Sequence, residues 1–260
     1  MALKHHSNHK LRFQQQVDNA ANYVLPFIEQ SLLIQPGLKV LEIGCGEGGV
    51  LKPFFDRGCH CVGVDLDQPR IDLAHEFLGQ EMKTGRMLIM NKNVYDDDFK
   101  QPYHEFFDLI VLKDVIEHIH NQEAFMPFMK TLLKPGGCIF FGFPPWQMPF
   151  GGHQQMNRNK WLSKLPYYHL LPKPLYKFIL TKGKGPVNEL LEIRDTRISI
   201  EKFERIAKQT GYAILYKQHY LFNPIYEYKF NVKAKPQFWF ISKIPYLRNY
   251  FTTCVYYLIG

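Results

Sequence analysis

Two histidines in the middle of the chain have the chemistry of a general base. His118 follows an apolar run that ends at Lys113, and His153 follows a Phe-Gly-Gly sequence. A positioned imidazole is the commonest protein base because its pKa lies close to neutral pH. His118 and His153 are therefore candidate catalytic residues that could take a proton from a reacting oxygen. For His153, an exposed histidine in a loop is an equally good interpretation.

A dense group of glycines follows the apolar run that begins at Val40, in the sequence V-L-E-I-G-C-G-E-G-G. Gly44, Gly46 and Gly48 let the backbone turn sharply and leave no Cβ between the backbone and a ligand. Backbone N–H groups at the start of the following helix would suit a polar or anionic part of that ligand. The pattern predicts a strand, a turn and a helix that together bind a nucleotide.

An acidic residue, Asp65, stands about 20 residues beyond these glycines, at the end of a second apolar run. Its carboxylate could accept hydrogen bonds from both hydroxyls of a ribose. Together with Gly44, Gly46 and Gly49 it fits the G-x-G-x-x-G fingerprint of dinucleotide-binding proteins, a pattern with many false positives. A nucleotide-dependent oxidoreductase is therefore one interpretation of the chain.

Strands and helices are expected to alternate around these residues. Apolar runs predict strands at 39–43, 59–64, 87–90, 107–112, 139–143, 212–222 and 252–259. Helices are predicted at 11–33, where Pro26 kinks or splits the helix, at 50–55, at 71–78 and after Ser199. This order predicts an α/β fold, a doubly wound, Rossmann-like, mostly parallel sheet of seven strands with helices on both faces. Ligands of such sheets bind at the carboxyl ends of the strands.

The chain is expected to form one domain, 1–260, with four parts. These are an N-terminal helical segment at 1–36, a cofactor-binding core at 37–145, a substrate-covering insertion at 146–198, and a C-terminal helix with the last two strands at 199–260. The insertion is rich in proline, aromatic residues and lysine and follows the fifth strand, where it would act as a lid.

Charge is divided unevenly along the chain. The net charge is −6 over residues 1–123 and +14 over residues 124–260, and no acidic residue lies between Glu123 and Glu189. The second half is therefore suited to meet an anion, although a solvated basic surface is an equal alternative.

Five cysteines without a C-x-x-C pair indicate neither a disulfide framework nor a zinc site. The first ten residues lack the apolar core of a secretory signal. A cytoplasmic protein is expected.

Four motifs in one order resemble the class I S-adenosylmethionine-dependent methyltransferases, in their small-molecule type. Glu42 and the three alternate glycines fit their E-x-G-x-G-x-G opening, and Asp65 ends the next strand. Residues 107–119, F-D-L-I-V-L-K-D-V-I-E-H-I, are similar to their fourth-strand motif, and L-L-K-P-G-G at 132–137 leads into strand five. Together the motifs span about 39–145 and are more specific than any one of them.

The resemblance implies S-adenosylmethionine as cofactor, with S-adenosylhomocysteine as product, and a set of binding residues. Gly44 to Gly48 would line its methionine part above Glu42, Asp65 would bind the ribose, and Leu66 would flank the adenine. Asn93 stands where the family usually has Asp, and its amide oxygen can still accept from the adenine amino group. The implied cofactor-binding set is Glu42, Gly44, Cys45, Gly46, Gly48, Asp65, Leu66, Asn93, Val94, Lys113 and His118.

The sequence D-x-x-E-H could hold a divalent cation, because residues three and four apart share a helix face. Asp114, Glu117 and His118 resemble the E-x-x-E-H element of metal-dependent methyltransferases, with His153 a conceivable fourth ligand. Acidic residues also favour a helix start without any metal. The metal-free interpretation is preferred, and no metal ligand is assigned.

The expected substrate is a small, acidic or amphiphilic molecule, methylated on oxygen or nitrogen. Lysines and aromatic rings of the second half could bind such a molecule or contact an anionic membrane surface. The rings are Phe143, Trp146, Phe150, Trp161, Tyr167, Tyr168, Tyr176 and Phe178. Nucleic acid is an improbable partner because no RNA-binding module accompanies these rings, and the sequence does not indicate an oligomeric state. A non-catalytic cofactor-binding module of the same fold also stays open.

Overall fold

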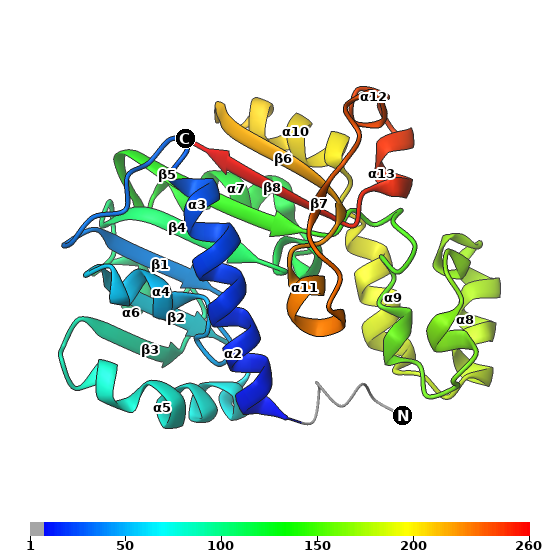
Figure 1. Cartoon of the computed structure of the whole chain (residues 1–260), viewed down its shortest axis with the longest axis horizontal. Coiled ribbons are helices and arrows are strands. Elements are labelled where there is room, and N and C mark those ends of the chain that lie inside the picture. Colours follow the sequence, from blue (N-terminus) through cyan, green and yellow to red (C-terminus); the bar gives the residue numbers. More distant parts are fainter. Residues whose placement is uncertain (1–7) are drawn as a thin grey trace.

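The computed structural model describes residues 8–260, which form one eight-stranded sheet with helices on both faces (Figure 1). Residues 1–7, part of the segment expected at 1–36, lie outside the described residues. The strand order is β3-β2-β1-β4-β5-β8-β6-β7. The strands are β1 Lys39–Ile43, β2 His60–Asp65, β3 Met87–Asn91, β4 Phe107–Lys113, β5 Leu133–Phe143, β6 Ile214–Phe222, β7 Lys235–Pro236 and β8 Cys254–Ile259.

The first five strands are parallel, and the last three form an edge with antiparallel pairing. β1 pairs with β2 and β4 in parallel register, whereas β8 pairs antiparallel with β5 and β6. The chain runs outward from β1 to β3 and then returns to β4 on the other side of β1, so the direction of winding reverses between β1 and β4. This switch point is where doubly wound sheets bind their ligands. The predicted fold class is confirmed.

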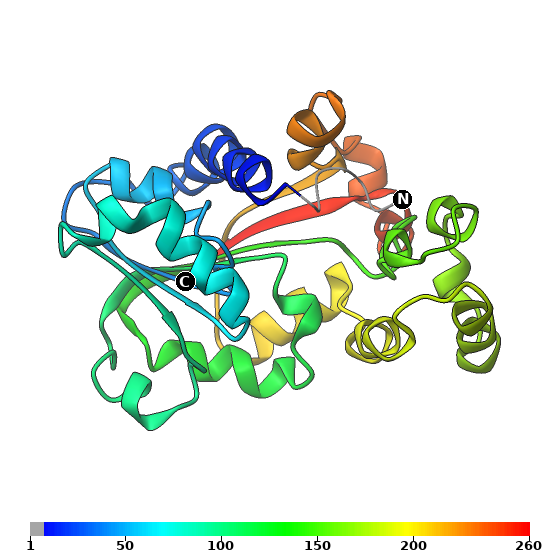
Figure 2. The ribbon, with the colours of Figure 1, turned by 90° about the horizontal axis from the view of Figure 1, so that it is seen from below.

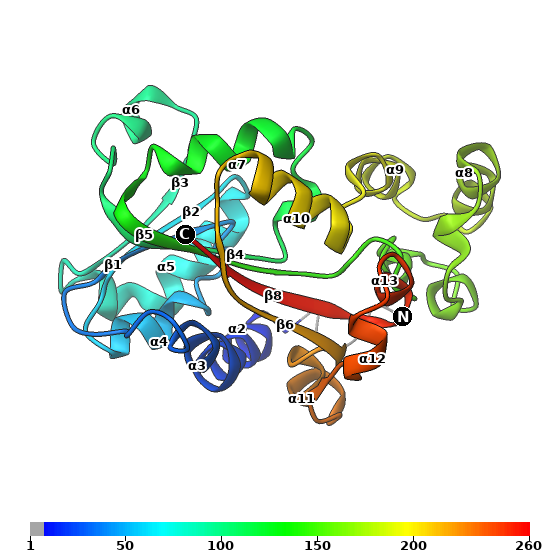
Figure 3. The ribbon, with the colours of Figure 1, turned by 90° about the horizontal axis from the view of Figure 1, so that it is seen from above.

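Twelve α-helices surround the sheet within residues 8–260. They are α2 His9–Asn19, α3 Leu25–Ile28, α4 Leu51–Asp56, α5 Gln68–Met82, α6 Asp97–Lys100, α7 Gln122–Lys130, α8 Lys173–Lys182, α9 Val187–Thr196, α10 Ile200–Gln209, α11 Ile225–Phe230, α12 Trp239–Ser242 and α13 Leu247–Phe251. Strand side chains alternate between two apolar layers: Val40 and Leu109 pack with α2 to α5, and Leu41 and Ile110 pack with α6, α7 and α10. Figures 2 and 3 show the helices on the two faces of the sheet from below and above.

The helix predicted over 11–33 is present but interrupted. α2 continues into a π-helical segment, η1 Ala20–Val24, and then into α3, which has Pro26 in its first turn. Proline lacks an N–H, and its ring crowds the turn before it, so a wider turn ahead of Pro26 relieves the clash. Pro26 is thus accompanied by a change of helix type and not by a gap between elements, and the helix predicted over 11–33 ends at Ile28.

The segment between β5 and α10 forms a layer beyond the carboxyl ends of the parallel strands (Figure 1). It contains α8, α9 and three short 3-10 turns, η3 Gln154–Met156, η4 Leu162–Lys164 and η5 Tyr168–Leu170. Its apolar side chains form a third cluster, separate from the two layers of the sheet, around Tyr176 and Leu190. The segment is therefore a packed structure and not an open loop.

Several aromatic residues expected on the substrate side are instead part of the core. Phe143, Trp146, Tyr168 and Tyr176 are buried, whereas Trp161 is 87% exposed. Aromatic residues that the sequence analysis did not single out are exposed around α12 and α13. Trp146, Tyr168 and Tyr176 fill the third cluster, which needs large side chains to bury a small layer, and Phe143 packs in one of the two layers of the sheet.

The eighth strand is a further difference from the sequence-based expectation. β7 has only two residues and pairs with the end of β6, between the last two strands that the sequence predicts, at 212–222 and 252–259. Two residues are too few to show the alternation that identifies a strand. β7 lies at the sheet edge, the place where its Pro236 is tolerated.

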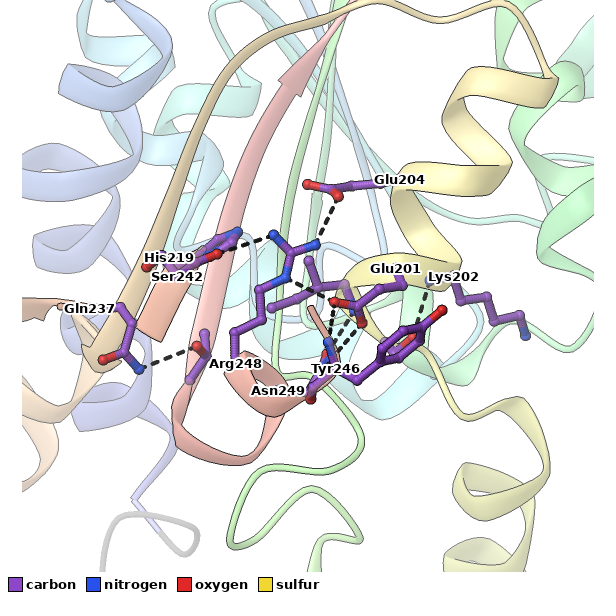
Figure 4. A network of polar contacts seen from close by, with 12 residues as sticks. Glu201, Lys202, Glu204, His219, Gln237, Ser242, Tyr246, Arg248 and Asn249 are labelled. Carbon is purple, nitrogen blue, oxygen red and sulfur yellow. Dashed lines mark hydrogen bonds and ion pairs between the residues drawn. The ribbon is translucent and has the colours of Figure 1, made fainter. Parts of the chain in front are cut away.

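A polar network joins α10 to α13 on the C-terminal edge of the sheet (Figure 4). The Arg248 side chain donates from Nε to Glu201 at 2.9 Å and from Nη2 to Glu204 at 2.9 Å. Asn249 accepts from the Ile200 N–H at 2.9 Å. Burial alone would raise the pKa of Glu201, but the hydrogen bonds it accepts, from the Tyr246 N–H first, outweigh burial and lower that pKa. The network fixes the long connection before β8.

We expect Arg248→Met to lower the free energy of unfolding by about 3 kcal/mol, since Glu201 and Glu204 would lose the charge that neutralises them. Because both glutamates have lowered pKa values in the folded state, the loss should be full above the pKa of a free glutamate and should shrink as the pH falls through the folded values. Urea unfolding at several pH values measures both effects. Lys173→Met, which breaks an exposed ion pair with Asp195, is the control and should change little.

Candidate functional site

The turn between β1 and α4 depends on glycine. Gly44, Gly46 and Gly48 have φ values of +73°, +53° and +77°, in the left-handed region that favours this residue. A Cβ on Gly46 would lie 2.0 Å from Nη2 of Arg70, and a Cβ on Gly44 would lie 2.5 Å from Cγ2 of Val115. The predicted strand-turn-helix is present, and its turn has no room for side chains at these positions.

A cavity of about 420 Å³, here called the loop cavity, lies at the carboxyl ends of β1, β2 and β4. Six of the residues predicted to bind the cofactor line it: Gly44, Asp65, Leu66, Asn93, Val94 and His118. The other five, Glu42, Cys45, Gly46, Gly48 and Lys113, are not among its lining residues. Sequence reasoning missed Arg70 and Tyr95 in the wall, since neither belongs to a motif.

Asp65 connects the end of β2 to the glycine turn. Its Oδ2 accepts the Gly46 N–H at 2.7 Å, and its Oδ1 accepts the Asp67 N–H at 2.9 Å. Each carboxylate oxygen has a second lone pair, so both can accept a further hydrogen bond from a ligand in the cavity. Asn93 uses its Oδ1 to accept the Tyr95 N–H at 3.1 Å, which orients its amide at the cavity wall.

Glu42 is a buried carboxyl in β1, next in sequence to Ile43 and Gly44, which line the loop cavity. It is 2% exposed, and its Oε2 has no hydrogen-bond partner among residues 8–260. Burial raises the pKa of Glu42 well above its usual value, although the ammonium group of Lys113 opposes this shift. Lys113 itself pairs with Asp114 at 2.7 Å. A buried oxygen without a partner beside a cavity fits a ligand that donates hydrogen bonds, as an amino group does.

Glu47, inside the glycine turn, is a functional residue that the sequence analysis missed. Its side chain is fully buried and forms ion pairs with Arg12 of α2 and, at 3.3 Å, with Arg70 of α5. Arg70 also approaches Asp65 at 3.8 Å. No local pattern identifies Glu47, because an acidic residue beside glycines is usually exposed and its two partners lie far away in the sequence.

His118 and His153 meet beside the loop cavity. Their ring centroids are 5.4 Å apart, and both line a smaller cavity of about 190 Å³. Burial lowers the pKa of His153 to about 4, with His118 adding to the effect, so its imidazole is neutral at pH 7. His153 is half-buried rather than an exposed loop histidine, and a neutral imidazole can accept a proton.

The carboxylate that groups with these histidines as a potential metal ligand is Glu117 and not Asp114. One potential ligand atom from each of Glu117, His118 and His153 lies within 4.8 Å of the others, and both carboxylate oxygens of Glu117 lack a hydrogen-bond partner among residues 8–260. Asp114 stands apart from this group because residues 116–118 form a 3-10 turn, and Asp114 itself has a φ of +57°. The expected shared helix face of Asp114, Glu117 and His118 is therefore absent, while His153 joins the last two.

A third and larger cavity of about 490 Å³, here called the α2–α11 cavity, lies between α2, α11 and the start of the insertion. Its lining includes Arg12, Phe150, Tyr226 and Lys229. Sequence reasoning expected substrate contacts in the insertion and did not foresee that α2 and α11 supply two of the walls. Three segments far apart in the sequence meet here, so no local signal marks the cavity.

Comparison with known proteins gives a consistent family. The domain family described as a methyltransferase domain matches residues 13–217. A ubiquinone biosynthesis O-methyltransferase of Bartonella bacilliformis is 27% identical over 162 residues, which are 59% of this chain and 62% of that protein. The chain thus spans about three-fifths of the length of this curated relative.

Solved structures share the fold at low sequence identity. A putative sarcosine dimethylglycine methyltransferase from Galdieria sulphuraria has a TM-score of 0.58 at 12% identity and covers 92% of this chain and 84% of that chain. Phosphoethanolamine N-methyltransferase 2 of Haemonchus contortus, solved in complex with S-adenosyl-L-methionine, has a TM-score of 0.57 at 16% identity. The match covers 92% of this chain and 52% of that chain. At these identities the likeness concerns the fold alone.

Proposed function

The chain belongs to the methyltransferase domain family, and we propose that it transfers a methyl group from S-adenosylmethionine to an oxygen or nitrogen of a small anionic or amphiphilic molecule. The observation that supports this most is the loop cavity, where the left-handed glycine turn, Asp65 and Asn93 meet at the switch point of the sheet. The unpartnered oxygen of the buried Glu42 suits the amino group of the cofactor.

S-adenosylmethionine supplies a methyl carbon that its sulfonium makes electrophilic. The chain's own residues would hold the cofactor: the glycine turn its amino-acid part, Asp65 the ribose hydroxyls, and Asn93 with Leu66 the adenine. The remaining task of the protein is to align the acceptor with the methyl carbon and to exclude water. The loop cavity and the smaller cavity, which both have His118 in their walls, offer space for that alignment, and the α2–α11 cavity offers more.

We expect Gly46→Ala to weaken binding of S-adenosylhomocysteine, because alanine is strained at a φ of +53° and its Cβ would displace the Arg70 guanidinium from the turn. Calorimetric titration of the wild type and of Gly46→Ala with S-adenosylhomocysteine measures the difference in affinity. Gly79→Ala is the matched control and should bind as the wild type does, since nothing lies within 4 Å of a Cβ at that helical position.

The same titration decides between the competing classes. Binding of NADH in place of S-adenosylhomocysteine would contradict the proposal and favour an oxidoreductase. Binding of S-adenosylhomocysteine without methyl transfer to any acceptor in a broad screen would favour a non-catalytic module of the same fold.

For the acceptor atom, the name of the Bartonella relative favours oxygen. An oxygen nucleophile needs its proton removed, and we propose His153 as the base or as a residue that positions the acceptor. Its neutral imidazole and its place beside His118 at the cavity wall support this role. His118 is the second candidate, because it lines both the loop cavity and the smaller cavity that it shares with His153.

We expect His153→Ala to lower kcat on the order of a hundredfold or more while S-adenosylhomocysteine binding is kept, because only proton removal is lost. We also expect the wild type to keep its activity after thorough chelation, in line with the preferred metal-free interpretation. Full turnover of His153→Ala would refute the role of His153. Loss of activity on chelation and its recovery with a divalent cation would identify Glu117, His118 and His153 as metal ligands instead.

We further propose peripheral contact with an anionic membrane, through the α12–α13 segment, residues 238–251. Trp239 and Tyr246 are 71% and 72% exposed, and Lys243 lies 4.9 Å from the Trp239 ring. No acidic residue occurs from 228 to 260. Exposed rings beside lysines suit the lipid interface. No helix among residues 8–260 is long and apolar enough to cross a bilayer.

We also propose a cytoplasmic setting. All five cysteines are buried free thiols, as is usual in a reducing compartment.

We expect the double variant Trp239→Ser, Tyr246→Ser to sediment less with vesicles that contain phosphatidylserine, because the rings would no longer insert at the interface. Leu33→Ser, which replaces an exposed apolar residue at the other end of the chain, is the control and should sediment as the wild type does. Equal sedimentation of the double variant and the wild type would refute the contact. It would also be refuted if the wild type bound neutral vesicles as well as vesicles that contain phosphatidylserine.

A further inference from the structure

We propose that the α2–α11 cavity binds an apolar anion, with the ammonium group of Lys229 as its charge partner. This inference rests on the proposed function, because it assigns the site of the methyl acceptor and narrows its chemistry. The cavity walls carry large apolar side chains, among them Met148, Phe150, Phe222 and Phe230. Its volume of about 490 Å³ is within the range of small-molecule sites.

Lys229 is the cation of this cavity that lacks a partner. Arg12 and Lys164 also line the cavity, but Arg12 is paired with Glu47 and Lys164 is exposed to solvent. Lys229 is half-buried and makes no hydrogen bond or ion pair within residues 8–260. No acidic residue lines the cavity. A cation removed from water without a partner is unfavourable, and an anionic ligand would compensate it.

The position of Lys229 connects the cavity to the cofactor site. The carboxylate of Asp114, which lines the loop cavity, acts electrostatically on both Lys229 and Tyr226, and these two residues line the α2–α11 cavity. Asp114 is itself paired with Lys113 at 2.7 Å, so its charge is already balanced. The charge of Lys229 is therefore felt at the loop cavity, where the cofactor is proposed to bind.

The walls of the cavity are held together before any ligand arrives. Gln15 of α2 donates to the backbone oxygen of Tyr228 at 2.8 Å, and Asn22 donates to the Tyr228 hydroxyl at 2.8 Å. Tyr23 also donates to Glu227. These contacts fix α11 against the N-terminal helix, and a preformed site loses less conformational entropy when it binds.

Calorimetric titration with dodecanoate tests the inference, with dodecyltrimethylammonium and dodecyl maltoside as probes that carry the same chain on a cationic or neutral head. We expect dodecanoate to bind the wild type in preference to both. Lys229→Met should weaken dodecanoate binding about tenfold, and Lys229→Arg should restore it. Lys208→Met, an exposed lysine on α10, is the control and should have no effect. The double variant Trp239→Ser, Tyr246→Ser should also bind normally, which would exclude binding at the α12–α13 segment.

A second readout separates a ligand-binding lysine from a structural one. Removing an unpaired, half-buried charge should leave the Tm of the free protein unchanged or raised, whereas loss of a structural lysine would lower it. If Lys229→Met does not fold, Lys229→Gln takes its place. The inference would be overturned if the wild type and Lys229→Met (or Lys229→Gln) bound dodecanoate with equal affinity. It would also be overturned if the wild type bound dodecyltrimethylammonium as tightly as dodecanoate.

The proposed function and this inference fail in different ways. Absence of S-adenosylhomocysteine binding with Lys229-dependent dodecanoate binding would refute the methyltransferase proposal and leave the anion site standing. If the protein transfers methyl groups but Lys229→Met binds dodecanoate as the wild type does, only the anion site is refuted.

Discussion

The burial of one charge, the carboxylate of Glu47, constrains the architecture around both larger cavities. A charge without solvent needs partners, and breaking such a pair typically costs about 3–5 kcal/mol. Glu47 obtains them from Arg12 of α2 and Arg70 of α5, which are separated by almost sixty residues of sequence. α2 must therefore dock against the glycine turn. In the same position, Arg12 and Gln15 become a wall of the α2–α11 cavity.

The glycine turn is thus held from two sides. Asp65 accepts the Gly46 N–H from the end of β2, and Arg70 lies so close to Gly46 that no Cβ fits between them. Arg70 also interacts with both Asp65 and Glu47. A turn fixed by hydrogen bonds and ion pairs keeps its shape without a ligand, so little reorganisation is required when a ligand binds.

The parts of the fold that sequence predicts are those whose cause is local. β1 and the left-handed glycines follow from an apolar run and from the absence of a Cβ, and the Ser199 cap of α10 follows from its own hydroxyl, which accepts the Lys202 N–H. Glu47 and Lys229 could not be predicted, because their significance depends on what lies near them in space. Glu47 forms ion pairs with two distant arginines, and Lys229 lies in an apolar wall without a hydrogen bond or ion pair to any residue in the described range 8–260.

The family match ends at residue 217, so all residues that line the loop cavity lie within it, whereas the α2–α11 cavity is lined from both sides of this boundary. The glycine turn, Asp65, Asn93 and both histidines lie within the match. Tyr226, Lys229 and the α12–α13 segment follow it, and Arg12 immediately precedes it. The shared part of the chain therefore carries the features suited to the cofactor, whereas most of the charged groups of the α2–α11 cavity lie outside. Changes in α11 could alter the acceptor without disturbing the glycine turn, because none of the described residues that line the α2–α11 cavity also lines the loop cavity.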